Sequence, residues 1–167
     1  HPFDDLDVMA GQGTIALEII EKLKKQGELD NTLIIFTGDN GYFQSDYQIA
    51  DKWYAYEQSI RVPFIVFDSR IPAGKRNISY KEIVLNIDIA PTLLSASGSP
   101  VPAAMQGEDL SRIYLKQHFT WRDDFFFEHP SINNEEFIPS SQAVMSTKEK
   151  YILYPHYGFQ QYFDLRK

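Results

Sequence analysis

The feature of this 167-residue sequence that most constrains its fold is a short unbroken apolar run, residues 33–37 (LIIFT). A run of this length with β-branched residues is typical of a strand buried on both faces. Residues 14–26 come before it, and there apolar side chains recur every four residues, the spacing of an amphipathic helix, at Ile15, Ile19 and Leu23. A helix followed closely by a buried strand predicts an α/β layered fold.

The next part of the sequence predicts a second buried strand and a second helix. The strand covers residues 62–67, and residues 83–88 lead into the helix, which Asp88 is expected to cap and Gly98 to end. Residues 42–61, between the two strands, are rich in Tyr, Asp and Gln and have little strand character. A loop of this length in a compact domain is usually functional or disordered, so it is a candidate for functional residues.

The sequence changes character after a Pro-rich linker at residues 99–107. A short helix is predicted at residues 110–115. Four later segments have the composition of strands: residues 124–129, 142–147, 150–154 and 161–165. We therefore predict that residues 1–105 belong to the α/β part and that residues 106–167, with the linker, form a small antiparallel β subdomain.

Cysteine is absent from the sequence, which excludes a disulfide scaffold, a zinc ribbon, a thiol redox site and a cysteine nucleophile within it. The 16 basic residues are outnumbered by 23 acidic ones, and the net charge of −7 argues against electrostatic binding of nucleic acid. No apolar run reaches the length of about 18 residues that a membrane-spanning helix needs. We therefore expect neither nucleic acid nor a membrane as a partner.

Two polar residues, Asp39 and Asn40, stand between glycines directly after the first predicted strand. Ligands of open α/β sheets bind at the carboxyl ends of strands, and a carboxylate with an amide oxygen suits Ca²⁺ or Mg²⁺. The same pair suits an Asx turn, in which the side chains bind their own backbone, and the dipeptide alone favours the turn. Lys52, in the following loop, is a candidate anion ligand, although a lone lysine is more often a solvated surface charge.

Other patterns identify no nucleophile and no histidine metal site. The four histidines, at positions 1, 118, 129 and 156, match no short metal-binding motif, and no Gly-x-Ser-x-Gly sequence occurs. Glu57 and Arg61 are four residues apart, a spacing that predicts a structural ion pair. The residues alone therefore give a candidate site for a hard cation and an anion.

Six segments, taken together and in order, resemble the C-terminal portion of the type I sulfatases of the alkaline phosphatase superfamily. They are residues 30–41 (DNTLIIFTGDNG), 50–54 (ADKWY), 56–63 (YEQSIRVP), 86–94 (NIDIAPTLL), 105–107 (MQG) and 162–165 (YFDL). The similarity runs from about residue 15 to residue 167, nearly the whole chain. The resemblance implies that residues 1–105 are the C-terminal part of the sulfatase catalytic domain.

The resemblance also implies roles for five residues of this sequence. Asp39 and Asn40 would hold a divalent cation, usually Ca²⁺ in this family, with Mg²⁺ as the alternative. Lys52 would bind the sulfate oxygens as a catalytic group, because a cation and an ammonium together neutralise the charge of a sulfuryl group. Glu128 and His129 fall where relatives have a similar pair, and we assign them to the substrate side.

The sequence departs from the family at two places. Tyr47 stands where relatives usually have a histidine, in a loop that reads QSDYQ instead of Leu-Gly-Glu-His-Gly. The Cys- or Ser-x-Pro-x-Arg segment, which gives the family its formylglycine nucleophile, is missing, as is the Asp pair that completes the metal site. We expect these elements upstream of His1, and a start at His instead of Met fits a processed, cloned or cropped chain.

The expected function is that of a fragment of a sulfuric ester hydrolase. Its parent would hydrolyse sulfate esters of a sulfated carbohydrate, with the remainder of the same polypeptide upstream, and this chain alone would be inactive. Three alternatives stay open: a phosphodiesterase or phosphonate hydrolase of the same superfamily, a non-catalytic sulfatase-like binding module, and a piece expressed or cut from a larger protein. The expected location is periplasmic or extracellular in a bacterium and lysosomal in a eukaryote.

Overall fold

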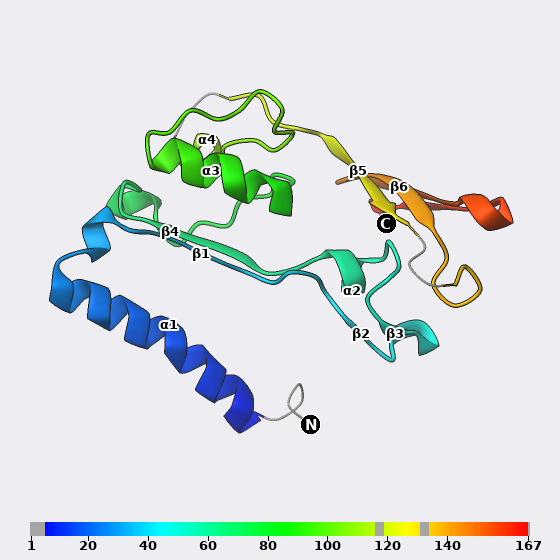
Figure 1. The fold of residues 1–167 in the computed structure, drawn as a ribbon, viewed down its shortest axis with the longest axis horizontal. Coiled ribbons are helices and arrows are strands. Elements are labelled where there is room, and N and C mark those ends of the chain that lie inside the picture. Colours follow the sequence, from blue (N-terminus) through cyan, green and yellow to red (C-terminus); the bar gives the residue numbers. More distant parts are fainter. Residues whose placement is uncertain (1–5, 116–118, 131–133, 167) are drawn as a thin grey trace. The chain divides into compact units, whose positions relative to one another are not determined.

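The computed structural model describes residues 6–115, 119–130 and 134–166 and gives an α/β fold (Figure 1). The chain divides into two compact units. The first combines His1–Ile35 with Val66–Arg76, and the second combines Phe36–Ile65 with Asn77–Lys167. This division does not coincide with the predicted one at residue 105, which stays a prediction. All five predicted site residues lie in the second unit.

The first unit contains the long helix α1 (Leu6–Gln26), which confirms the helix predicted over residues 14–26. α1 begins earlier than predicted because Gly11 and Gly13 weaken the helical signal in the sequence. Gly27 follows the end of α1, and its φ of 71° is the left-handed conformation that glycine adopts after helices. No helix in the described part of the chain is long and apolar enough to cross a bilayer.

Strands β1 (Leu33–Thr37) and β4 (Phe64–Asp68) pair with each other and confirm both predicted strands. β4 begins two residues later than predicted, because Pro63 has no N–H to give to a ladder. The prediction that the first strand is buried on both faces is wrong for this chain. The side chains of Phe36 and Ile65 are 58% and 61% exposed. Burial on both faces needs a layer on each side, and the described residues leave part of this sheet uncovered.

The segment between these strands holds more regular structure than predicted. β2 (Phe43–Gln44) and β3 (Ala50–Asp51) form a small antiparallel hairpin, and α2 (Glu57–Ile60) is a single helical turn. Phe43 is fully buried and meets the rings of Tyr54 and Tyr56 edge-on, which anchors the hairpin. Strands of two residues are too short to leave an alternating pattern, so the sequence did not predict them.

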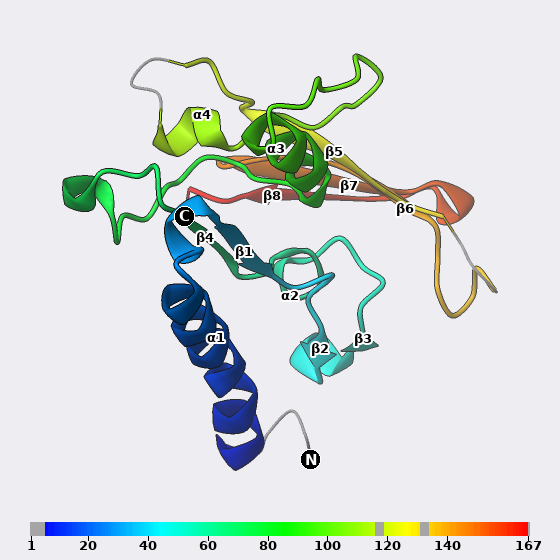
Figure 2. The ribbon, with the colours of Figure 1, turned by 60° about the vertical axis from the view of Figure 1, so that its left-hand side comes forward.

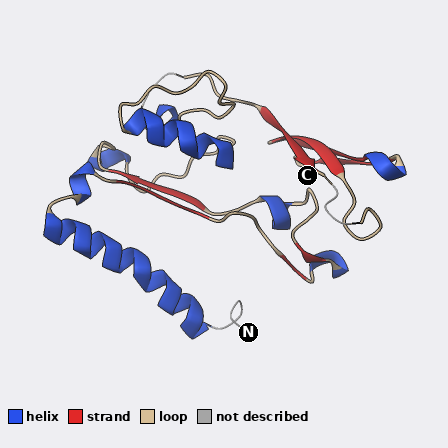
Figure 3. Cartoon of the chain, viewed as in Figure 1, coloured by secondary structure: helices blue, strands red, loops and turns tan. Residues whose placement is uncertain are grey.

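The C-terminal strands form the predicted antiparallel sheet (Figures 2 and 3). The strand order is β5-β6-β7-β8. Their bounds are β5 (Asp124–His129), β6 (Ser141–Ser146), β7 (Glu149–Tyr154) and β8 (Phe159–Asp164). Side chains alternate between a buried and an exposed face, as antiparallel strands do when one side packs on a core. The fold is therefore the predicted α/β arrangement with a small C-terminal antiparallel sheet.

The buried face of this sheet packs on the chain that follows Lys52. Ala55 is fully buried in a cluster with four side chains of the sheet, Ala143, Met145, Ile152 and Tyr154. Tyr54, Tyr56 and Ile60 pack around this cluster from the same segment. The loop that carries Lys52 is therefore anchored at its end by the core of the sheet.

Helices α3 (Ile89–Ala96) and α4 (Ser111–Tyr114) confirm the two helices predicted after β4. Gly98, with a φ of 73°, follows the end of α3 as predicted. Asp88 stands at the N-cap position of α3, but its side chain makes no capping hydrogen bond there. The capping prediction for Asp88 is wrong, because its carboxylate is engaged by a buried network.

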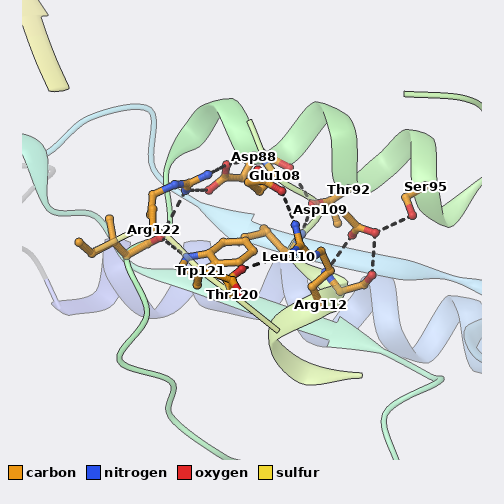
Figure 4. A network of polar contacts seen from close by, with 12 residues as sticks. Asp88, Thr92, Ser95, Glu108, Asp109, Leu110, Arg112, Thr120, Trp121 and Arg122 are labelled. Carbon is orange, nitrogen blue, oxygen red and sulfur yellow. Dashed lines mark hydrogen bonds and ion pairs between the residues drawn. The ribbon is translucent and has the colours of Figure 1, made fainter. Parts of the chain in front are cut away.

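In this network Asp88 is fully buried and accepts four hydrogen bonds from described residues (Figure 4). Two come from the guanidinium of Arg122, at 2.5 and 2.7 Å, and two from the backbone N–H groups of Leu85 and Glu108, both at 2.8 Å. Arg122 also lies over the ring of Trp121, with Cζ 5.0 Å from the centroid. The network joins the start of α3, the linker after it and the chain that enters β5.

Candidate functional site

The loop after β1 holds Asn40 in one orientation. Its side-chain NH₂ donates to the carbonyl oxygen of Ser59 at 2.7 Å and also lies 3.1 Å from the carbonyl oxygen of Gly41 and 3.4 Å from that of Lys52. Because the nitrogen is bound on the protein side, the amide oxygen of Asn40 is directed away from these carbonyls. A side chain held in this way presents an oxygen ligand.

Asp39 lies beside it with an almost fully exposed carboxylate, 86% accessible to solvent. One oxygen accepts the backbone N–H of the next residue, Asn40, at 2.8 Å. An Asx turn would instead bind the N–H of Gly41, two residues on, and that N–H donates to the Ser59 carbonyl. The second oxygen lies 3.6 Å from the ammonium nitrogen of Lys52. The Asx turn is therefore wrong for Asp39, and the local bond to Asn40 occupies only one lone pair of the carboxylate.

Ser59 ties these residues together, and the sequence did not single it out. The residue is buried in α2, and its hydroxyl donates to the carbonyl oxygen of Lys52 at 2.8 Å. Its own carbonyl oxygen receives the Asn40 amide and, at 2.7 Å, the backbone N–H of Gly41. One buried residue thus fixes the loop after β1 and the backbone at Lys52.

Lys52 reaches the same place from the other side of the loop. Its ammonium faces Asp39, and its side chain is partly exposed, at 38%. A separation of 3.6 Å is longer than a hydrogen bond, so the contact is a loose ion pair that leaves the ammonium free to bind an anion. The structure therefore brings together Asp39, Asn40 and Lys52, the three residues that the sequence proposed for the cation and the sulfate.

The donor set fits part of a hard-cation site. A carboxylate and an amide oxygen are ligands that Ca²⁺ and Mg²⁺ accept, but these ions take six or more oxygen ligands. Within the ranges that the structure describes, no group of three or more His, Cys, Asp or Glu residues gathers in one place. Asp39 and Asn40 thus offer two of the oxygen ligands that such an ion requires.

Glu128 and His129 are separated by the alternation of β5. Glu128 is on the exposed face, where its carboxylate accepts the side-chain amide of Gln142 at 2.9 Å. The ring of His129 lies 5.6 Å from the ring of Trp53, the residue after Lys52. Only His129 of this pair is therefore next to the segment that carries Lys52. His1 and His118 lie outside the described residues.

Two buried polar atoms lie next to each other in the ladder between β5 and β6. His129 and Ser141 are cross-strand partners, and His129 Nδ1 and Ser141 Oγ have no hydrogen-bond partner among the described residues. The sequence did not point to Ser141, because the pairing of β5 with β6 is set by tertiary structure.

The predicted ion pair between Glu57 and Arg61 is wrong. Arg61 lies beyond the end of α2 in an extended conformation, so the four-residue spacing does not bring the two side chains together on a helix. The carboxylate of Glu57 instead binds the ammonium of Lys150 on β7, at 2.6 Å. A partner 93 residues away leaves no local signal in the sequence.

Residues 45–167 match the sequence model of a family described as N-sulphoglucosamine sulphohydrolase, C-terminal. The chain belongs to the type I sulfatase family, as its C-terminal portion. An arylsulfatase of Clostridium perfringens is 32% identical over 146 residues, which are 87% of this chain and 29% of the relative. The human N-acetylglucosamine-6-sulfatase is 38% identical over 119 residues, 67% of this chain and 21% of the relative.

Solved structures agree with this sulfatase fold. A protein solved in complex with its substrate, D-glucosamine-2-N,6-O-disulfate, superposes with a TM-score of 0.80 at 27% identity, covering 89% of this chain and 31% of that one. A phosphonate monoester hydrolase of Agrobacterium radiobacter gives a TM-score of 0.76 at 24% identity, covering 89% and 32%. The similarity to the phosphonate monoester hydrolase shows only that the two proteins share a fold.

The sulfatase chain spans less than a third of the length of these relatives. Membership of the family implies a metal ion and a formylglycine in general terms.

Proposed function

We propose that this chain is the C-terminal part of a sulfuric ester hydrolase that removes sulfate from sulfated carbohydrates. The main observation behind the proposal is that Asp39, Asn40 and Lys52 lie close together around Ser59. This arrangement places two candidate oxygen ligands next to an ammonium group. The names of relatives support the substrate class, since the human and a Bacteroides thetaiotaomicron relative are N-acetylglucosamine sulfatases. Relatives named extracellular sulfatases support a location outside the cytoplasm.

Asp39 and Asn40 would hold the divalent cation, Ca²⁺ or Mg²⁺, through a carboxylate oxygen and the amide Oδ1. When bound, the cation supplies positive charge against the sulfate oxygens. The ammonium of Lys52 adds a second positive charge, and its contact with Asp39 directs it to the same place. Ser59 holds the nitrogen side of the Asn40 amide, so that the amide oxygen would be the atom available to the cation.

His129 is the substrate-side residue that the geometry favours. Its ring and that of Trp53 lie together beside the Lys52 segment and would present a flat face to a sugar ring. Because Nδ1 is buried, a sugar hydroxyl would bind Nε2. Glu128 faces away from this place, so a substrate contact by the pair rests on His129. The nucleophile, a formylglycine, is expected from the polypeptide upstream of His1.

The test compares the complete polypeptide with the 167-residue chain on 4-methylumbelliferyl sulfate and on N-acetylglucosamine 6-sulfate. We expect the complete protein to hydrolyse sulfate esters and the chain alone to be inactive. In the complete protein, Lys52→Met should lower kcat/KM by about 100-fold or more, because it removes a preorganised positive charge. Lys75→Met, which removes an exposed ammonium in the first unit, is the matched control and should leave kcat/KM unchanged.

Three outcomes would contradict parts of this proposal. Faster cleavage of a phosphonate monoester or phosphodiester than of a sulfate ester would establish the other hydrolase class. Binding of sulfated sugars without turnover by the complete protein would establish a binding module. Robust sulfate release by the 167-residue chain would show that its nucleophile lies within residues 1–167.

A further inference from the structure

Lys150 is a buried lysine on the inner face of the sheet, and its cross-strand neighbours are apolar. Its side chain is 4% exposed, and its neighbours across the ladder are Met145 on β6 and Phe163 on β8. Its ammonium lies 2.6 Å from a carboxylate oxygen of Glu57, the first residue of α2, whose side chain is half exposed. Moving a cation from water into apolar surroundings costs hydration free energy. The attraction between Lys150 and Glu57 offsets only part of that cost.

Stability gives no reason for a lysine at this position. Buried ion pairs can often be replaced by apolar side chains of similar volume with no loss of stability, or with a gain. A directional contact, however, selects one position among several that apolar packing would allow. α2 is a single turn of four residues, and two directional contacts join it to the sheet: the ion pair of Glu57 with Lys150, and the hydrogen bond from the Tyr56 hydroxyl at its N-cap to Gln161 on β8.

α2 contacts the residues of the candidate site directly, so its position affects theirs. Glu57 and Ser59 are two residues apart in a helical turn and so point to roughly opposite sides of it, about 200° apart. Glu57 binds the sheet, whereas Ser59 binds the Asn40 amide and the Lys52 carbonyl. α2 therefore lies between β7 and the loop after β1, and movement of α2 along the sheet would turn the Asn40 amide.

We propose that Lys150 is a positioning residue of the sulfatase site: its ion pair with Glu57 fixes α2 on the sheet and thereby sets the Asn40 amide and the Lys52 backbone. The C-terminal sheet is thus part of the cation-binding and sulfate-binding apparatus. This inference rests on the proposed function for its Ca²⁺ readout and on the geometry alone for its backbone readout.

The decisive variant replaces both charges in the complete protein, as Glu57→Leu with Lys150→Met. We expect the melting temperature to be retained or raised, Ca²⁺ affinity by calorimetry to fall about tenfold, and the Gly41 amide to exchange its hydrogen faster. The Gly41 N–H reports α2 directly, because it is bound to the Ser59 carbonyl. Unchanged affinity and exchange in this folded variant would overturn the proposal, since a purely structural pair would alter only the melting temperature.

Two further variants keep the test decisive. If the double variant does not fold, Glu57→Gln removes a half-exposed charge without opening the core, and we expect lower Ca²⁺ affinity and faster Gly41 exchange from it as well. The control is Lys25→Met, which breaks the exposed pair with Glu21 on α1 and should change neither readout. If the unaltered protein binds no Ca²⁺, the proposed cation site fails, and Gly41 exchange still decides the role of Lys150.

Discussion

Gly41 lies where no larger residue fits. A Cβ added to it would lie 2.1 Å from the carbonyl oxygen of Gln58, which is backbone and cannot turn aside. Its N–H also binds the Ser59 carbonyl at 2.7 Å. The glycine after Asn40 is therefore required for the close approach of the loop to α2, in addition to any role in a turn.

We expect Gly41→Ala to destabilise the protein by about 1–3 kcal/mol, the usual cost of forcing a methyl group into packed backbone. It should also weaken Ca²⁺ binding, since the Asn40 amide is held by the same helical turn. Thermal unfolding and calorimetry measure the two effects. Gly74→Ala is the matched control, because nothing lies within 4 Å of its added Cβ. Equal melting temperatures for the two variants would contradict the close approach.

At the scale of elements, the Asp88–Arg122 network holds three segments with one buried carboxylate. Gly107 takes part in this packing, since a Cβ there would lie 2.0 Å from the carbonyl oxygen of Ile87. The side-chain N–H of Trp121 donates to the carbonyl oxygen of Ile83 at 2.7 Å, next to the cation–π contact with Arg122. The chain entering β5 is thereby fixed before the sheet begins.

Arg122→Ala should destabilise the protein by about 3–5 kcal/mol, because it leaves the fully buried Asp88 carboxylate without its cation. Urea unfolding measures this. Arg112→Ala breaks a much more exposed pair with Glu108 and should cost about 1 kcal/mol or less. A loss in Arg122→Ala no larger than in this control would show that the network contributes little.

Tyr154 on β7 makes the stability of the sheet sensitive to alkali. Burial, and after it the hydrogen bond and proximity of Tyr56, raises the pKa of Tyr154 above that of a free tyrosine. Because the folded-state pKa is the higher one, this stabilisation is complete below pH about 10 and is lost as the pH rises beyond it. Absorbance at 295 nm should therefore show a late tyrosine ionisation that accompanies unfolding. Tyr154→Phe should remove that late step, and its persistence would contradict the assignment.

At the scale of the whole molecule, the chain exposes apolar surface on β1 and β4. Phe36 and Ile65 are both more than half exposed on two paired strands. We expect the isolated chain to self-associate through this surface, because contiguous exposed apolar side chains promote association. Sedimentation should show less association for Phe36→Thr with Ile65→Thr. Tyr157→Thr, at an exposed position of the second unit, should have no such effect.

The elements that the sequence predicted are those with a local signal. The apolar runs of β1 and β4, the four-residue spacing in α1 and the alternating C-terminal strands all depend on neighbouring residues. The Asp39–Asn40 pair could be recognised from the sequence because its two residues are adjacent and stand between glycines. Ser59, Lys150 and Arg122 were not, because each acts on a partner 7 to 93 residues away through the tertiary fold. The hairpin of β2 and β3 was missed because its strands have two residues each.

The alternation of β5 has a practical consequence. Glu128 and His129 are adjacent in the sequence but lie on opposite faces of the sheet. The sequence contains no cysteine, so Glu128→Cys would create a single thiol in it. A fluorophore attached there would lie on the face of β5 opposite His129. Its emission could report ligand binding near His129, and the dye would not occupy the binding site.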